Sequence, residues 1–167
     1  MPHRIDYRGP MQHVERSARI PAPRDEVYAF LADLDRLAEW QSGVISARRT
    51  SDGPMAVGAT AHLVRELMGQ RIEAPLTVTV HEPPARLVID SETGGVRATV
   101  SLDLGVPPDA PDATDLRFAM DIRGSLVTRF LEGIVANAAA ADIEASLERI
   151  RATFAATDAH DAGAGPA

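Results

Sequence analysis

Two segments of the chain alternate between apolar and polar residues, with Ala119 as the exception. In 96–104 every second residue is apolar, and in 114–122 the same alternation runs from position 116 onward. Successive side chains of a β-strand point to opposite faces, so a period of two indicates a strand covered on one side only. Both segments therefore predict strands of an antiparallel sheet with one apolar face and one face in water. The apolar residues are Val96, Ala98, Val100, Leu102, Leu104, Leu116, Phe118, Met120 and Ile122.

Five further segments carry weaker strand patterns. Turn-forming pairs such as Asp52-Gly53 and Gly94-Gly95 separate several of them. Because short links join antiparallel neighbours, we expect consecutive strands to pair in that way. With the two alternating segments they predict a sheet of about seven strands. The additional segments are 13–20, 44–50, 59–68, 71–81 and 86–91.

Three segments have the apolar spacing of helices. Pro23 and the acidic residues that follow it are typical of a helix start and predict a short helix over 23–32, with a second short turn over 35–40. Segment 125–154 lacks proline and repeats apolar residues at helical intervals, which predicts one amphipathic helix of roughly 40 Å. A sheet must curve to cover a helix of that length. Strands followed by such a helix predict an α+β two-layer domain.

The chain length favours one domain. Its 167 residues with 45% hydrophobic content are enough for a single core. We place the domain at 12–156, between a flexible leader at 1–11 and a disordered tail at 157–167, where the residues are small and polar. Cysteine is absent from the sequence, which excludes disulfides and thiolate metal sites.

Charge and hydropathy narrow the partners. A formal net charge of −7 repels polyanions, so we expect no nucleic acid partner. The sequence has neither the apolar run of a signal peptide nor the roughly 18 unbroken apolar residues of a membrane helix. We therefore predict a cytoplasmic protein that does not span a membrane. Exposed strand edges allow either a monomer or a homodimer.

The segment 20–40, with the sequence IPAPRDEVYAFLADLDRLAEW, resembles the opening of the START-like helix-grip superfamily (SRPBCC), often labelled polyketide cyclase/dehydrase and lipid transport. Gly58, the proline turn at 81–87 and the long helix at 124–150 resemble later features of that family, in the same order. The resemblance covers about 12–154. It implies a helix-grip fold, in which a curved antiparallel sheet wraps around the C-terminal helix after two short helices, with a ligand cavity between them. Such a fold does not determine function.

If a cavity is present, the apolar sheet face lines one side of it and the C-terminal helix the other. The helix has small residues around Asn137, which either open space for a ligand or let the sheet approach closely. Trp40 is either a gate over the pocket or an anchor for its short helix. The alternative is that these side chains pack on one another as core. The candidate ligand-binding residues are Trp40, Leu76, Val78, Val100, Leu102, Phe118, Met120, Phe130, Ile134, Asn137, Ala138 and Ala141.

Catalytic candidates are few. His62 and Glu66 share one face of the third predicted strand and would lie about 13 Å apart, able to act from two ends of a cavity if that face is inward. The opposite face is more apolar, so a surface pair is the alternative. An inward Arg16 would suit a carboxylate-bearing ligand. The histidines are scattered, and the nucleophile-elbow, phosphate-loop and zinc-protease motifs do not occur, so we expect no metal and no cofactor.

Three functions remain open. The first is a binding protein for a small, mostly apolar molecule such as a lipid or a polyketide-like compound. The second is an enzyme of the polyketide aromatase/cyclase or dehydratase type, in which Trp40, His62, Glu66 or Arg16 would position the substrate and move protons. The third, implied by the resemblance, is an accessory or interaction module resembling the accessory protein of carbon monoxide dehydrogenase.

Overall fold

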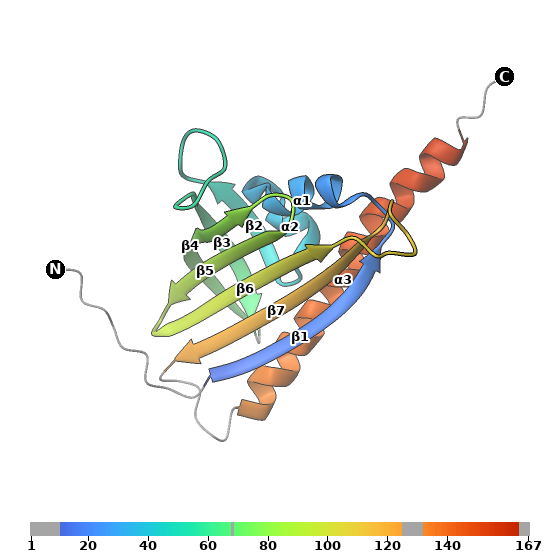
Figure 1. The fold of residues 1–167 in the computed structure, drawn as a ribbon. Helices are drawn as coiled ribbons and strands as arrows, with labels where there is room; N and C mark the ends of the chain where they lie inside the picture. The colour runs from blue at the N-terminus through green and yellow to red at the C-terminus, as the bar shows by residue number, and fades with distance from the viewer. Residues whose placement is uncertain (1–10, 68, 125–131, 164–167) are drawn as a thin grey trace.

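The protein is described by a computed structural model of residues 11–67, 69–124 and 132–163, with side chains from 133 to 157 in the last range. A seven-stranded antiparallel sheet forms one layer, and the long helix α3 packs on it (Figure 1). The predicted α+β architecture is confirmed. The elements are β1 (Met11–Ile20), α1 (Arg24–Ala32), the short helix η1 (Leu34–Arg36), α2 (Leu37–Trp40), β2 (Val44–Arg49), β3 (Thr60–Leu67), β4 (Gln70–Glu82), β5 (Arg86–Thr93), β6 (Val96–Gly105), β7 (Thr114–Gly124) and α3 (Glu132–Gly163).

The first strand of the chain pairs with the last. The sheet order is β1-β7-β6-β5-β4-β3-β2, so β1 and β2 form the two edges and the helical segment between them spans the interior. Figure 1 shows the sheet curving around α3, with α1 and α2 covering the remaining part of the same face. The face toward these helices is called the inner face below, and the opposite one the outer face.

Local sequence explains the short helices. Helix α1 begins after Pro23, and Asp25 and Glu26 lie in its first turn, where the helix dipole favours acidic side chains. Asp33 has an extended backbone conformation and ends α1. It is also the N-cap of η1, because its carboxylate accepts a hydrogen bond from the N–H of Asp35. The side chains that α1, η1 and α2 bury are Val27, Tyr28, Phe30, Leu31, Ala32, Leu34, Leu37 and Trp40.

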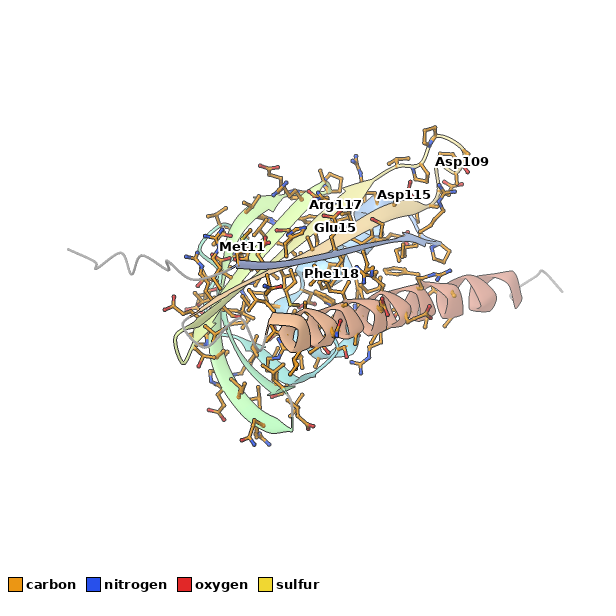
Figure 2. All side chains as sticks on the ribbon, turned by 90° about the horizontal axis from the view of Figure 1, so that it is seen from below. Met11, Glu15, Asp109, Asp115, Arg117 and Phe118 are labelled. Carbon is orange, nitrogen blue, oxygen red and sulfur yellow. The ribbon has the colours of Figure 1, made fainter. Side chains whose placement is uncertain are left out.

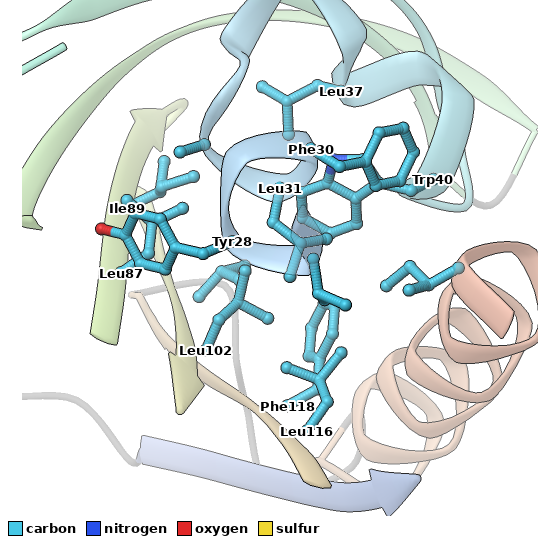
Figure 3. Close-up of a cluster of buried hydrophobic side chains, with 14 of the residues drawn as sticks. Tyr28, Phe30, Leu31, Leu37, Trp40, Leu87, Ile89, Leu102, Leu116 and Phe118 are labelled. Atoms are coloured by element: carbon cyan, nitrogen blue, oxygen red, sulfur yellow. The ribbon is translucent and has the colours of Figure 1, made fainter. Parts of the chain in front are cut away.

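The core lies between these helices and the inner face (Figure 3). Phe118 of β7 meets the Trp40 ring edge to face, with the ring centroids 6.0 Å apart. Such aromatic pairs contribute about 0.5–1.5 kcal/mol beyond the apolar area they bury. Leu102 pairs with Phe118 and Leu104 with Leu116 across β6 and β7, so the apolar residues of both alternating segments point to the same face, as predicted.

Helix α3 is held by large apolar side chains in its middle part. Ile143, Leu147, Ile150 and Phe154 are buried, and the Phe154 ring meets Phe30 of α1 edge to face at 5.5 Å. Their spacing of four, three and four residues places them on one side of the helix. Burying three aliphatic side chains and a phenyl ring releases more free energy than burying alanines, so this stripe sets the rotation of the whole helix.

That rotation corrects the predicted helix-side contacts. Ile134, Asn137 and Ala141 are exposed, so they do not point toward the sheet. Ala138 is partly buried at the boundary, and Phe130 lies outside the described residues. The small residues that do pack on the core in the first turns of α3 are Ala136, Ala139 and Ala140.

The described helix extends further than the composition predicted. Helix α3 continues to Gly163, although the predicted disordered tail begins at 157. Residues 157–162 contain neither proline nor glycine, and extending a helix that is already formed costs little compared with nucleating it. At the other end β1 begins at Met11, and the rest of the predicted leader, 1–10, lies outside the described residues.

Candidate functional site

The six sheet residues predicted to contact a ligand all point to the inner face. Each is at most 7% exposed, and all six belong to one continuous core with the fully buried Trp40. Figure 2 shows the contrast on neighbouring positions: Phe118 lies between the sheet and α3, while Glu15 and Arg117 extend from the opposite face. The six residues are Leu76, Val78, Val100, Leu102, Phe118 and Met120.

Burial along the inner face differs between the two ends of the sheet. Where α1 lies, inward residues such as Leu87, Leu104 and Leu116 are almost fully buried, and we call this the closed end. Where α3 begins, the inward residues keep partial contact with solvent, and we call this the open end. Protein cores are normally close-packed, so these inward side chains form an apolar surface that the rest of the protein covers only in part. The open end is defined by Gln12, Ile72, Ser91, Val96, Ala98 and Ile122.

An ion pair joins the sheet to α3 beside the open end. Arg65 of β3 pairs with Ile72 in the register, so its side chain is on the inner face, and its Nη2 donates to Asp142 Oδ2 of α3 at 2.9 Å. The Arg65 side chain is 16% exposed, and its Nε is buried without a hydrogen-bond partner among the described residues. Burial raises the pKa of Asp142, and the charge and hydrogen bond of Arg65 oppose that rise.

Arg65 was not among the residues selected from the sequence, although a signal was present. It shares the strand face of Ala61 and Leu63, which are both buried, so the more apolar face of β3 is the inner one. An arginine in an otherwise apolar strand face is costly to bury without a partner. That partner, Asp142, is distant in the chain and no local pattern marks it.

Side chains alternate along β3, so His62 and Glu66 lie on the outer face when Arg65 lies on the inner one. The His62 side chain is 44% exposed and lies 3.9 Å from Glu73 of the neighbouring strand, and Glu66 is exposed. The surface alternative therefore describes their positions. Arg16 is on the inward side of β1, opposite Phe118, but β1 is an edge strand and its guanidinium reaches out to Glu144 of α3 at 3.2 Å.

The Trp40 side chain is completely buried in the core. Its indole Nε1 has no hydrogen-bond partner among the described residues. A buried donor left unpaired costs about 1–3 kcal/mol. Trp40 Nε1 and Arg65 Nε are thus two interior donors with capacity for an acceptor.

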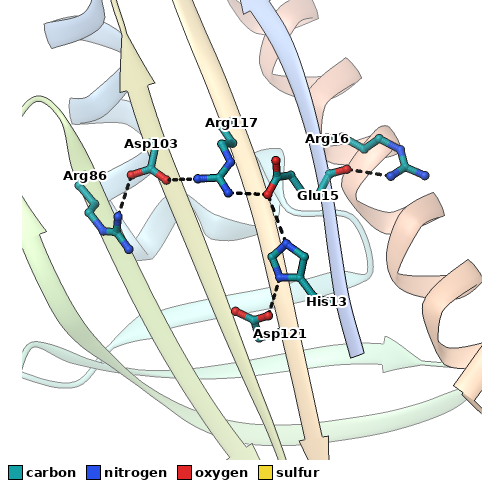
Figure 4. Close-up of polar contacts among 7 residues, drawn as sticks. All are labelled: His13, Glu15, Arg16, Arg86, Asp103, Arg117 and Asp121. Atoms are coloured by element: carbon teal, nitrogen blue, oxygen red, sulfur yellow. Dashed lines mark hydrogen bonds and ion pairs between the residues drawn. The ribbon is translucent and has the colours of Figure 1, made fainter. Parts of the chain in front are cut away.

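On the outer face, a row of charged side chains from β1 to β5 is paired (Figure 4). Hydrogen bonds and ion pairs link His13, Glu15, Arg117, Asp103 and Arg86 across β1, β7, β6 and β5. The hydrogen bond from Arg117, followed by that from His13, lowers the pKa of Glu15 to about 2. These groups satisfy one another, and within the described part of the chain no three His, Asp or Glu side chains are placed to hold a metal ion.

The fold and interior define a class: a two-layer α+β protein whose curved sheet grips a C-terminal helix around an apolar interior. The family model described as polyketide cyclase / dehydrase and lipid transport matches residues 11–155. The chain belongs to this family, within the START-like helix-grip proteins that the sequence resembled.

Solved structures of low sequence identity share the fold. A START superfamily protein from Mycobacterium smegmatis is 15% identical, with a TM-score of 0.71 over 87% of this chain and 98% of that one. The Zhui aromatase/cyclase from Streptomyces sp. R1128 is 16% identical, with a TM-score of 0.70 over 87% of this chain and 94% of that one. A protein from Thermus thermophilus is 19% identical, with a TM-score of 0.70 over 89% and 99%. None of the curated proteins compared matches this chain.

Proposed function

We propose that this protein binds a small, mostly apolar molecule, such as a lipid or a polyketide-like compound, between the inner face at the open end and the alanines of α3. One observation carries the proposal: Ala98, Ile122 and their neighbours point inward yet remain accessible to solvent. Apolar surface that faces a protein interior and still contacts water gains free energy when a ligand covers it. Membership of the polyketide cyclase and lipid transport family supports this ligand class.

Arg65 gives the proposed ligand a polar group to orient on. Its guanidinium projects from β3 beside the open end, and its Nε has no partner among the described residues. A ligand carbonyl or carboxylate near Arg65 would gain a charge-assisted hydrogen bond, which is roughly twice as strong as a neutral one. We therefore expect an amphipathic ligand with one acceptor group rather than a pure hydrocarbon.

A second candidate function is an enzyme of the polyketide cyclase or dehydratase type that uses the same interior. Arg65 favours it, because a cation held in an apolar site can stabilise negative charge that develops on a substrate oxygen. Asp142, whose pKa is raised by burial, is the nearest group that could exchange a proton. His62 and Glu66 do not take part in this version, because they lie on the outer face.

The proposal also covers the cell compartment, the oligomeric state and the binding partners of the protein. Within the described residues no helix combines the length and apolar character required to cross a bilayer. We propose a cytoplasmic protein, monomeric or homodimeric, whose partner is the small apolar ligand and not a nucleic acid. Cell fractionation and size-exclusion chromatography with light scattering test these points.

The test of binding compares two phenylalanine substitutions. Ala98→Phe places a ring inside the open end, whereas Ser17→Phe places the same ring on the exposed outer side of β1. Native mass spectrometry of the freshly purified protein is expected to show a retained molecule. A fluorescent probe of apolar surfaces, such as the amphipathic anion 1-anilinonaphthalene-8-sulfonate, is expected to bind. Ala98→Phe should weaken probe binding at least tenfold, and Ser17→Phe should leave it unchanged. Equal binding by both variants would remove the open end as the site.

The enzyme candidate is tested separately. Once the retained molecule is identified, it is incubated with the protein and with Arg65→Met, and the products are followed by mass spectrometry. Conversion by the native protein that is lost in Arg65→Met supports the enzyme. If the molecule binds tightly but neither its mass nor its isomeric form changes, the result supports binding and contradicts the enzyme.

A further inference from the structure

A separate groove lies at the closed end, away from the open end. It has a volume of about 460 Å³ and runs between α1, η1, the loop after β2 and the end of β4. Ala29, Ala32 and Met55 give it an apolar floor, and Tyr28 and His81 line it together. Grooves of this size hold small organic molecules. The function proposed for the open end makes no use of it.

A β-bulge turns His81 toward this groove. Val78 of β4 pairs with Ile89, but Val80 then pairs with Val88, and His81 with Leu87. Leu87 and Ile89 both point inward, so the extra residue between the two pairings places His81 on the inner side. Uninterrupted alternation from Val78 would have pointed His81 outward. Such bulges are over-represented at sheet edges and next to active sites, where they redirect a side chain.

Tyr28 selects the tautomer of His81. The Tyr28 hydroxyl oxygen lies 2.8 Å from His81 Nδ1 and 3.1 Å from the backbone oxygen of Arg86. Burial raises the pKa of Tyr28 to about 12, so the hydroxyl keeps its single proton. A carbonyl only accepts, so both contacts are hydrogen bonds when Tyr28 donates to Arg86 and His81 Nδ1–H donates to Tyr28. Neutral His81 then carries its lone pair on Nε2.

The other polar groups of the groove add acceptors. Asp33 uses one carboxylate oxygen to accept the N–H of Asp35, and Asp35 uses one to accept the N–H of Arg49. The Arg49 guanidinium is held by the Ser51 hydroxyl and the Pro54 carbonyl. The second oxygens of Asp33 and Asp35 and His81 Nε2 have no hydrogen-bond partner among the described residues, although the charge of Arg36 is near that of Asp33. Three acceptors therefore border an apolar floor.

We propose that this groove binds a small organic cation, a protonated primary amine with an apolar body. The ammonium group would donate to His81 Nε2 and to the carboxylates of Asp33 and Asp35, while the apolar body covers Ala29 and Met55. An ammonium has three donors and a positive charge, which match three acceptors, two of them negative. A neutral alcohol supplies one donor without the charge, and a carboxylate is repelled.

Benzylamine, benzyl alcohol and benzoate are suitable probes, because they share one ring and differ in the donor group. In NMR titrations near pH 7 we expect benzylamine to shift the methyl signals of Ala29, Ala32 and Met55, with benzyl alcohol at least tenfold weaker and benzoate without effect. Asp33→Asn and Asp35→Asn keep the local hydrogen bonds and remove the charges, so each should weaken benzylamine about two- to fivefold. The exposed Asp52→Asn is the matched control and should change nothing.

The imidazole provides an independent test. Long-range ¹H–¹⁵N spectra should show the lone pair of neutral His81 on Nε2, and benzylamine should shift that nitrogen more than Nδ1. Tyr28→Phe should mix the tautomers and weaken benzylamine several-fold. Equal affinity for benzylamine and benzyl alcohol, or a lone pair on Nδ1 in the native protein, would overturn the proposal while leaving the open end untouched.

Discussion

The two ends of the inner face are built by the same strands but are filled to different degrees. On β6, Leu102 at the closed end is fully buried, and Ala98 two inward positions earlier is only partly buried. On β7, Phe118 and Ile122 differ in the same way. Helices α1 and α2 bring bulky side chains over the closed end, whereas α3 brings alanines to the open end. One alternating strand can thus support a packed core at one end and a partly covered apolar surface at the other.

The largest effect is expected at the closed end. Phe118→Ala removes a side chain that is 1% exposed. The edge-to-face contact with Trp40 is lost, and a cavity remains beside the indole ring. Such a substitution costs about 3–5 kcal/mol of unfolding free energy, because the transfer free energy is lost and a cavity remains. Urea denaturation followed by circular dichroism measures it. A loss below about 1 kcal/mol would mean that the closed end is not close-packed.

A smaller loss is expected for the ion pair beside the open end. Arg65→Met leaves the Asp142 carboxylate partly buried without its partner and should cost about 1–3 kcal/mol at pH 7. Burial raises the folded-state pKa of Asp142 above its usual 3.8, so the native state binds more protons and its stability falls as pH rises through that window. The charge and hydrogen bond of Arg65 oppose this rise in the pKa of Asp142. The loss in Arg65→Met should therefore shrink when pH is lowered below about 3.8.

The double variant Arg65→Met with Asp142→Asn serves as the control. A neutral amide requires no counter-charge, so this variant should recover part of the lost stability at pH 7. A loss in Arg65→Met that stays the same at all pH values would show that packing of the arginine stem, and not its charge, is responsible.

Ile122→Ala sharpens the comparison on a single strand. Ile122 points to the same face as Phe118 but is only partly buried, so we expect a loss of about 1–2 kcal/mol, well below that of Phe118→Ala. The same denaturation experiment measures both. Binding of the fluorescent probe 1-anilinonaphthalene-8-sulfonate should change in Ile122→Ala. It should stay the same in Phe118→Ala as long as that variant remains folded. Equal losses would remove the distinction between the two ends.

The smallest effect is expected on the outer face, where both ends are alike. The pKa of Glu15 is lowered to about 2 by Arg117 and His13, so its contribution to stability is present above pH 4.5 and is lost as pH falls from 4.5 toward 2. Glu15→Gln should therefore be slightly less stable than the native protein at pH 7, and the difference should disappear only as pH falls below about 2. Because the Glu15 side chain is 37% exposed, solvent screens the pair and the difference is small. Carboxyl ¹³C titration of Glu15 checks the pKa directly.

Much of the fold follows from local patterns. The alternation at 96–104 and 114–122 determines which side chains face inward, because the side-chain period of a strand is independent of its partners. Pro23, Asp25 and Glu26 mark the start of α1 for equally local reasons. The family resemblance on 20–40 then identified the helix-grip arrangement, which the family match confirms.

The tertiary structure decided the rest. The rotation of α3 depends on how Ile143 to Phe154 fit the sheet, and that fit exposed Asn137 and Ala141. Arg65 lies in the proposed ligand site beside Asp142 only because folding brings β3 and α3 together. His81 points into the groove only because a bulge in β4 shifts the register of that strand. Sequence periodicity assigns each side chain to a face of its own element. Which faces meet, and how completely they fill the space between them, depends on packing between segments far apart in the chain.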